Sequence, residues 1–372
     1  MTVIAAGAVV LDGAVHRPGW VSVADGRITD CGSGPVGADA DFGDCVVVPG
    51  FVDMHVHGGA GVSYADDPDR AAALHASHGT TGGLASLVTA SPETLLAQVR
   101  TLAAATRRGV VDGIHLEGPW LSRLHCGAHD SGQLRAPDDA EIDALLAAGD
   151  GTIRMVTLAP ELPGGIAAIR RLVDAGVVVA VGHTDADYEL TQAALDAGAT
   201  VATHLFNAMR ALHHREPGPV PALLSDPRVT VELIADGVHL HAGVIRHVVA
   251  TAGPDRVALV TDAMAAAGAG DGGFTLGGLD VDVAGGVARL RGTATIAGST
   301  ATMDRLFATA VRLLGGDDAA LRAAVLMTAS TPARALGLDG AGVLAAGSTA
   351  NLVVMNADLH VVRVMRRGTW LS

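Results

Sequence analysis

Six side chains that can bind a metal ion or move a proton stand at the ends of apolar stretches. They are His55, His57, Glu117, His183, His204 and Asp262. His55 and His57 are two residues apart, which puts both imidazoles on the same face if this stretch is a strand. Imidazole nitrogen and carboxylate oxygen suit zinc, iron or manganese. The set therefore predicts a metal centre that could activate water for hydrolysis.

Each of these residues has a simpler interpretation when it is taken alone. The His55–His57 pair could be two partly buried histidines with satisfied hydrogen bonds, and Glu117 could contact a neighbouring loop. His183 and Asp262 stand where helices are expected to begin, so capping would account for their surroundings. Only the repetition of the pattern, a polar residue at the end of an apolar run, favours a common site.

The residues that must position these side chains form a repeating pattern. Eight apolar, strand-like runs are separated in most cases by stretches of helical composition; the runs are residues 50–57, 81–89, 109–118, 152–161, 176–184, 200–207, 229–237 and 256–263. Near-continuous apolar strands that alternate with helices indicate an α/β fold, the parallel (β/α)₈ barrel of TIM type. The candidate residues stand at the carboxyl ends of these strands, where barrel active sites lie.

The two ends of the chain show a different pattern, with short strands and frequent turns. We expect residues 1–49 and 338–372 to form one small β domain, a β-sandwich built from both termini. Residues 50–337 are expected to form the barrel. The Gly-rich stretch 264–297 is expected to be a strand-like insertion after the eighth strand.

The composition excludes several classes of function. Of the 372 residues, 25 are arginine and none is lysine, which excludes Schiff-base chemistry, a P-loop lysine and a carbamylated lysine bridging two metals. The net charge of −14 argues against non-specific binding to nucleic acid or anionic membranes. Cys31, Cys45 and Cys126 do not form a disulfide pattern. Since we find no signal peptide and no transmembrane run, we expect a cytoplasmic protein.

Several longer motifs resemble those of one enzyme family. They are PGFVDMHVHGG (49–59), HLEGPWLS (115–122), GAHDSGQL (127–134), LAPE (158–161), GHTDA (182–186), ATHLFNAM (202–209), REPG (215–218), ADGVH (235–239), LVTDAMAAAG (259–268) and IAGST (296–300). The chain resembles, over nearly its whole length, the N-acetylglucosamine-6-phosphate deacetylases of the amidohydrolase superfamily. HLEGPW followed by GAH, and THLFNAM followed by REPG, are specific to the deacetylases within that superfamily.

The resemblance implies a metal centre and a catalytic group. Glu117, His183 and His204 would hold a metal ion found in all members, and Asp262 would be the catalytic acid and base. His55 and His57 would hold a second ion with Glu117 as the bridge; members without this pair bind one ion. We therefore expect one or two divalent ions per subunit, zinc first, with iron, cobalt, manganese or cadmium as alternatives.

The resemblance also implies residues for the substrate, an amino-sugar phosphate. His129 and His239 would contact the sugar or the scissile acetamide. Asn207, Ala208 and Arg215 would bind the phosphate, with Arg215 supplied by the neighbouring subunit of a homodimer. Because the chain has no lysine, an arginine is the side chain expected to bind this group. Neither nucleic acid nor a membrane is expected as a partner.

The expected reaction is hydrolysis of the N-acetyl group of N-acetyl-D-glucosamine 6-phosphate to D-glucosamine 6-phosphate and acetate, in amino-sugar catabolism or cell-wall sugar recycling. The alternatives are a deacetylase for N-acetylgalactosamine 6-phosphate or an unphosphorylated sugar, a cyclic-amide hydrolase or aminoacylase, and a non-catalytic scaffold. THLFNAM and REPG argue against the cyclic-amide hydrolase or aminoacylase, and the complete set of ligand positions argues against a scaffold. Cys126 replaces part of a lysine-containing stretch usual in the family, and it is either in a variable loop or a reactive thiol near the mouth.

Overall fold

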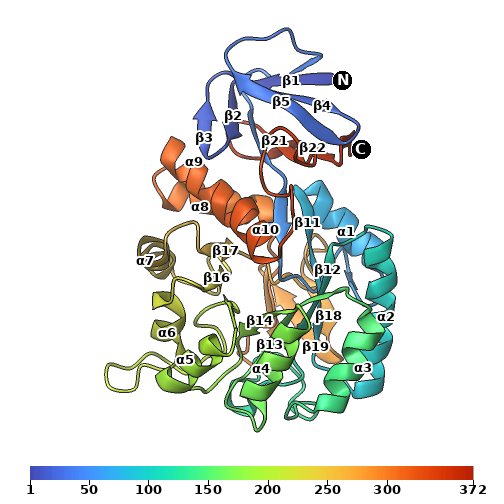
Figure 1. Ribbon diagram of the computed structural model, residues 1–372, viewed down its shortest axis with the longest axis vertical. Helices are drawn as coiled ribbons and strands as arrows, with labels where there is room; N and C mark the ends of the chain where they lie inside the picture. Colours follow the sequence, from blue (N-terminus) through green and yellow to red (C-terminus); the bar gives the residue numbers. More distant parts are fainter. Residues whose placement is uncertain (372) are drawn as a thin grey trace.

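The computed structural model describes residues 1–371, in which a parallel barrel carries a small β domain at one end (Figure 1). Eight parallel strands follow one another around the barrel in chain order. They are β8 (Phe51–Asp53), β11 (Thr80–Val88), β12 (Gly113–Glu117), β13 (Ile153–Leu158), β14 (Val178–Val181), β15 (Val201–Ala202), β16 (Thr230–Leu233) and β17 (Val257–Leu259). Seven of the eight apolar runs contain one of these strands, and β11 begins one residue before its run. The predicted (β/α)₈ barrel is therefore confirmed.

A helix follows each barrel strand and covers the outside of the barrel (Figure 1). The helices are α1 (Pro68–Ser77), α2 (Pro92–Arg107), α3 (Asp139–Gly149), α4 (Gly165–Asp174), α5 (Tyr188–Asp196), α6 (Pro219–Ser225), α7 (Ala242–Ala252) and α8 (Met303–Leu313). Five of them begin at a capping side chain. Asp67, Ser91, Asp138, Asp187 and His241 accept hydrogen bonds from first-turn amides of α1, α2, α3, α5 and α7.

Apolar side chains fill the inside of the barrel and close the end nearest the small β domain. α9 (Asp318–Val325), a π-helical turn (Leu326–Ser330) and α10 (Thr331–Ala335) follow α8. Ala333 of α10 and Leu336 belong to the same buried cluster as Met54, Leu84 and Met155 of the barrel. With the amino ends of the strands covered in this way, the carboxyl ends form the open mouth.

The two ends of the chain form two further sheets that pack together. The four-stranded sheet has the order β5 (Arg27–Ser33), β4 (Gly19–Ala24), β1 (Thr2–Ala6), β6 (Ala40–Asp41); the six-stranded sheet has the order β23 (Thr369–Trp370), β22 (Val361–Arg366), β21 (Leu352–Met355), β7 (Val46–Pro49), β2 (Ala8–Leu11), β3 (Ala14–His16). One buried cluster joins Ile4 and Val21 of the first sheet to Val47 and Val354 of the second. The expected sandwich from both termini is therefore present, and residues 1–49 and 338–372 remain its proposed extent.

Three shorter elements surround the mouth of the barrel. A hairpin of β9 (Gly58–Gly59) and β10 (Val62–Ser63) follows β8, and a 3₁₀ turn, η1 (Arg123–His125), follows β12. The expected insertion after β17 is a three-stranded antiparallel sheet of β18 (Gly272–Leu276), β19 (Leu279–Ala284) and β20 (Val287–Leu290). No helix of the described chain combines the length and the apolar run needed to cross a bilayer.

Candidate active site

The six predicted metal or catalytic residues meet at the carboxyl ends of the barrel strands. Glu117 is the last residue of β12, and the other five follow β8, β14, β15 and β17. His183, His204 and Asp262 adopt positive φ angles of 48°, 26° and 47°. Residues other than glycine rarely adopt this conformation, which costs energy and is most often kept where function requires it. The backbone thus turns sharply after three of the strands, and each turn presents its side chain at the mouth.

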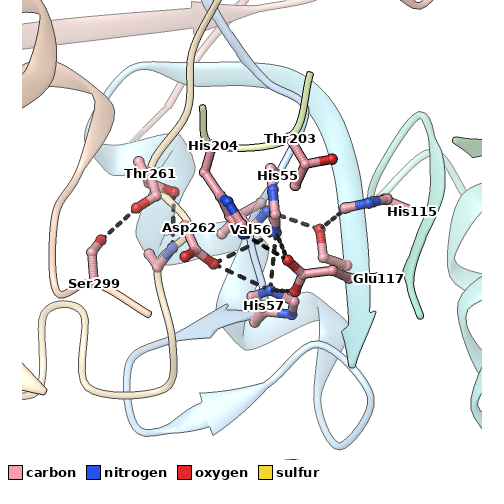
Figure 2. Close-up of polar contacts among 12 residues, drawn as sticks. His55, Val56, His57, His115, Glu117, Thr203, His204, Thr261, Asp262 and Ser299 are labelled. Atoms are coloured by element: carbon pink, nitrogen blue, oxygen red, sulfur yellow. Dashed lines mark hydrogen bonds and ion pairs between the residues drawn. The ribbon is translucent and has the colours of Figure 1, made fainter. Parts of the chain in front are cut away.

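Glu117 lies at the centre of this group of side chains. Its Oε1 is 3.1 Å from Nε2 of His183 and 3.0 Å from Nε2 of His204. Its Oε2 is 3.1 Å from Nε2 of His57, and Nε2 of His55 is 3.4 Å from Oε1. One carboxylate therefore contacts all four predicted histidine ligands, which follow three different strands, as Figure 2 shows for His55, His57 and His204.

The donor atoms form two overlapping groups that fit divalent metal ions. His55, His57, Glu117 and Asp262 offer ligand atoms that all lie within 4.8 Å of one another, and so do Glu117, His183 and His204. All of these residues are buried. Several buried imidazole nitrogens and carboxylates aimed at one point are costly without a cation to balance them, and this donor set is one that zinc and similar ions prefer. The residues present thus suit a metal centre with Glu117 shared.

The buried carboxylates favour the protonated, positively charged form of the neighbouring His57. Burial alone would lower the pKa of His57, but hydrogen bonds to Asp262 and Glu117 raise it to about 9. Burial also works against the Asp262 carboxylate, but the His55 charge and the His57 hydrogen bond lower the pKa of Asp262 to about 2. Asp262 is therefore ionised at neutral pH. Because a metal ligand must give up its proton, metal binding at such a centre is coupled to proton release.

A second layer of hydrogen bonds holds the turns that carry His55 and Asp262. The Thr261 hydroxyl donates to Oδ2 of the fully buried Asp53 at 2.5 Å. The Ser299 hydroxyl donates to the Thr261 carbonyl at 2.5 Å (Figure 2). The backbone N–H of Asp262 donates to the His55 carbonyl at 2.9 Å. Together with the bonds from the N–H groups of His57 and Gly58 to the Ala263 carbonyl, this bond joins the segments that follow β8 and β17. The contacts that close the barrel therefore also position the site.

His129 is a neutral hydrogen-bond donor in the site. The backbone N–H of Thr89 donates to Nδ1 of His129 at 3.3 Å, so the proton of the neutral imidazole is on Nε2. Burial, which the Glu117 charge only partly offsets, lowers the pKa of His129 to about 4. Nε2 lies 3.3 Å from Oε2 of Glu117. The Nε2–H group therefore points toward the metal centre, as a substrate-binding donor requires.

The metal centre forms the floor of a pocket of about 400 Å³, a size typical of small-molecule sites. Nine of the predicted residues line this pocket: His57, Glu117, His129, His183, His204, Asn207, Ala208, His239 and Asp262. His55 lies beneath it, fully buried. On the other side the pocket is bounded by the insertion, through Leu276, Thr295 and Ile296.

Arg215 is the predicted site residue that the structure places outside this pocket. It lies on the exposed loop between β15 and α6, where its guanidinium is 2.8 Å from Nε2 of His214. Within residues 1–371, no arginine lines the pocket. A role for Arg215 at this chain's own metal centre is therefore not visible in a single subunit.

Three acidic residues that support the site were not identified from the sequence. Glu232 accepts hydrogen bonds from His55 and His204, Asp53 holds Thr261, and Oδ2 of Asp236 is 2.8 Å from Nδ1 of His239. Burial disfavours the charged form of His239, but Asp236 outweighs it and raises the pKa of His239. The sequence does contain a signal for two of them. Glu232 and Asp53 are charged residues within apolar strand runs, and such residues are rarely buried unless they are paired.

Comparison with known proteins gives one family. The sequence profile described as "Amidohydrolase family" matches residues 46–371. The chain is 39% identical to the N-acetylgalactosamine-6-phosphate deacetylase of Escherichia coli O157:H7, over 95% of this chain and 96% of that protein. It is also 39% identical to the N-acetylglucosamine-6-phosphate deacetylase of Homo sapiens, over 86% of this chain and 82% of that protein.

Solved structures agree with these sequence matches. A variant of the N-acetyl-D-glucosamine-6-phosphate deacetylase from Mycobacterium smegmatis, in complex with N-acetyl-D-glucosamine-6-phosphate, is 55% identical to this chain. The two superpose with a TM-score of 0.97 over 99% of this chain and 98% of that one. The enzyme of the same name from Thermotoga maritima is 31% identical and superposes with a TM-score of 0.89, over 98% and 97% of the two chains.

Proposed function

This chain belongs to the amidohydrolase family, and we propose that it hydrolyses the N-acetyl group of N-acetyl-D-glucosamine 6-phosphate to D-glucosamine 6-phosphate and acetate. The observation that carries this proposal is the convergence of four imidazoles and two carboxylates at the floor of one pocket. The similarity to the Mycobacterium smegmatis enzyme supports the choice of substrate. A place in amino-sugar catabolism or cell-wall sugar recycling follows from that substrate.

We expect one or two divalent ions at this centre, with zinc as the first choice. Glu117, His183 and His204 would hold one ion, and His55 and His57 would hold the second with Glu117 shared. When bound, such ions supply the Lewis acidity that activates water and polarises a carbonyl. The overlap of the two donor groups at Glu117 supports the shared arrangement. Imidazole and carboxylate ligands also accept iron, cobalt, manganese or cadmium, so the cell's supply influences which ion is bound.

Asp262 is the residue that we propose moves the proton during amide hydrolysis. It lines the pocket, and its Oδ1 is 3.2 Å from Nε2 of His57 at the centre. As an ionised carboxylate it accepts a proton from the attacking water. It then returns that proton to the amide nitrogen, which cannot leave as an anion. His239, held by Asp236, and His129, with its Nε2–H group, are donors available to the acetamide or the sugar.

The substrate phosphate requires cationic donors that a single subunit does not bring to the pocket. Asn207 and Ala208 line it and would contact the phosphate, but within the described residues it has no arginine, and the chain has no lysine. We therefore propose a homodimer in which Arg215 of one subunit reaches the pocket of the other. The exposed position of Arg215 on its loop fits this role.

Replacing Arg215 with alanine should raise KM for the phosphorylated sugar by about 10- to 100-fold, because a charge-assisted phosphate contact is lost. KM for unphosphorylated N-acetylglucosamine should hardly change. Steady-state kinetics on both sugars measure the effect. Arg246→Ala, which removes an exposed arginine of α7, is the matched control. Equal effects of Arg215→Ala on the two sugars would contradict the phosphate role.

Mixing two defective variants tests whether Arg215 acts across subunits. Arg215→Ala and Asp262→Asn chains, unfolded and refolded together, should form mixed dimers in which one site has both native residues. About a quarter of all sites would then be restored in an equal mixture, by random pairing of a two-fold dimer. If Arg215 acts within its own subunit, no site of the mixture has both residues and activity does not return.

Acetate release from the zinc-reconstituted protein tests the proposed reaction. N-acetylglucosamine 6-phosphate, its galactosamine epimer and unphosphorylated N-acetylglucosamine should be compared side by side. We expect the highest kcat/KM for N-acetylglucosamine 6-phosphate. Preference for the epimer would favour the second candidate, an N-acetylgalactosamine-6-phosphate deacetylase, which the similarity to the Escherichia coli O157:H7 protein supports. Metal bound without activity on any of the three would contradict both.

We expect this reaction to occur in the cytoplasm. Cys31, Cys45 and Cys126 are all unpaired, which fits a reducing compartment.

A further inference from the structure

Glu232 is a fully buried carboxylate behind the metal centre. It is in β16 between Val231 and Leu233, which are also fully buried. An ionised side chain in such surroundings is costly unless hydrogen bonds and charges compensate it. The contacts of Glu232 therefore indicate what keeps it there.

Two ligand-bearing segments of the centre converge on one oxygen of Glu232. Its Oε2 is 3.1 Å from Nδ1 of His55 and accepts the backbone N–H of His204 at 3.1 Å. The backbone carbonyl of Glu232 accepts the next amide, that of Leu205, at 2.9 Å. His204 is one of the residues with positive φ, at 26°. Glu232 thus holds the strained turn that presents His204 and also contacts the ring of His55.

The contact with His55 determines which nitrogen of that ring can bind a metal. A carboxylate accepts a proton but has none to donate, so Nδ1 of His55 carries the hydrogen. Nε2 then keeps its lone pair, and Nε2 is the atom that faces Glu117 and His57. A carboxylate on the far nitrogen of a ligating histidine orients the ring and makes it a stronger ligand.

Among the four predicted histidine ligands, His55 is the one whose far nitrogen meets a carboxylate in the described chain. Nδ1 of His183 is 2.8 Å from the His125 carbonyl, whereas Nδ1 of His57 and Nδ1 of His204 have no hydrogen-bond partner within residues 1–371. The orientation of the His55–His57 half of the centre therefore depends heavily on a single side chain.

We propose that Glu232 is a positioning residue of the metal centre, which fixes His55 for ligation through Nε2 and holds the turn of His204. The Glu232 carboxylate thus contacts one residue of each donor group, His55 and His204. Glu117, which belongs to both groups, also connects them. The inference rests on the metal centre proposed above, because it assigns a role toward the ions of that centre. The proposal assigns an effect on metal affinity to a residue that is not itself a predicted ligand.

Zinc titration of the metal-free protein in competition with a chelator tests this role directly. Glu232→Leu removes the oxygen that accepts both hydrogen bonds and should weaken zinc binding by about 10- to 100-fold. Glu232→Gln keeps an acceptor oxygen but loses the charge, so a smaller loss of about two- to tenfold is expected. Glu141→Gln, which changes a carboxylate of α3 that contacts Arg135 and Trp120, is the matched control and should bind zinc as the wild type does.

Thermal unfolding of the metal-free forms separates positioning from a purely structural role. If Glu232 only stabilised the fold, the variants would unfold at lower temperature but bind zinc with unchanged affinity, and the proposal would be overturned. If Glu232→Leu does not fold, Glu232→Gln decides: weaker zinc binding supports the proposal, and unchanged binding refutes it.

The result is distinguishable from a failure of the proposed reaction. If the wild-type protein binds zinc but releases no acetate from any of the sugars, the proposed reaction is contradicted. The zinc affinities of the variants would still decide the role of Glu232. A wild-type protein that binds no zinc would overturn both proposals.

Discussion

Replacing Asp262 with asparagine should lower kcat for acetate release by about 10³-fold or more, near the upper end for general acid–base catalysis. Asparagine has nearly the same shape, and its backbone N–H can still donate to the His55 carbonyl. What it lacks is a carboxylate that takes a proton from water and returns it to the amine. In the proposed mechanism one residue performs both transfers, so its loss should affect formation and breakdown of the tetrahedral intermediate alike.

Rate and metal content must be measured together for this variant. Oδ1 of Asp262 lies among the donor atoms of the His55–His57 group, so a loss of activity could also follow from a loss of metal. We expect Asp262→Asn to keep the ion at Glu117, His183 and His204, with KM within a few-fold of wild type. A variant with bound metal and a nearly normal rate would refute the role of Asp262.

Glu117→Gln should abolish detectable deacetylation and deplete metal from both halves of the centre. Its carboxylate is the member common to the two groups of candidate donor atoms, and it contacts the four imidazoles of these groups. A neutral amide cannot bridge two cations, and its NH₂ group would oppose imidazole nitrogens that need a lone pair free for metal. Mass-spectrometric metal analysis after dialysis measures the loss.

Thermal unfolding with and without zinc provides an independent readout of Glu117→Gln. A ligand that binds only the folded state stabilises it by about 2.7 kcal/mol at 100 times its Kd. The wild-type melting temperature should therefore rise with zinc, and that of Glu117→Gln should not. Glu141→Gln, which changes a residue outside both donor groups and outside the pocket lining, should respond as wild type does. A zinc-induced rise in Glu117→Gln equal to that of wild type would contradict the bridging assignment.

The barrel and the six residues at its mouth could be predicted because they depend on local sequence. Parallel strands buried on both faces need continuous apolar runs, as in β12, where all residues from Gly113 to Glu117 are buried. A polar residue that ends such a run must lie at the mouth, whichever strands are its neighbours. The sequence therefore predicts that His183 and His204 lie close together at the mouth. It does not show which side chains on the other strands they contact.

Glu232 and Asp236 escaped prediction because their roles depend on contacts between strands. Glu232 reaches His55 only because the barrel brings the ends of β8, β15 and β16 to one level, a consequence of strand stagger and tilt. Asp236 is three residues before His239, but this spacing alone does not show that the two side chains meet. In the proposed homodimer, the place of Arg215 would depend on a second chain, which the sequence of one chain does not describe.

During synthesis, the strands of the small β domain leave the ribosome at very different times. β7 pairs with β2 early, but its other edge must wait for β21, with Val48 opposite Val353. The whole barrel is made in between, while that edge stays open to pairing with other chains. A premature stop before β21 would thus leave an intact barrel sequence with a permanently exposed strand edge, and we expect such truncated chains to aggregate even though every residue of the metal centre has been made.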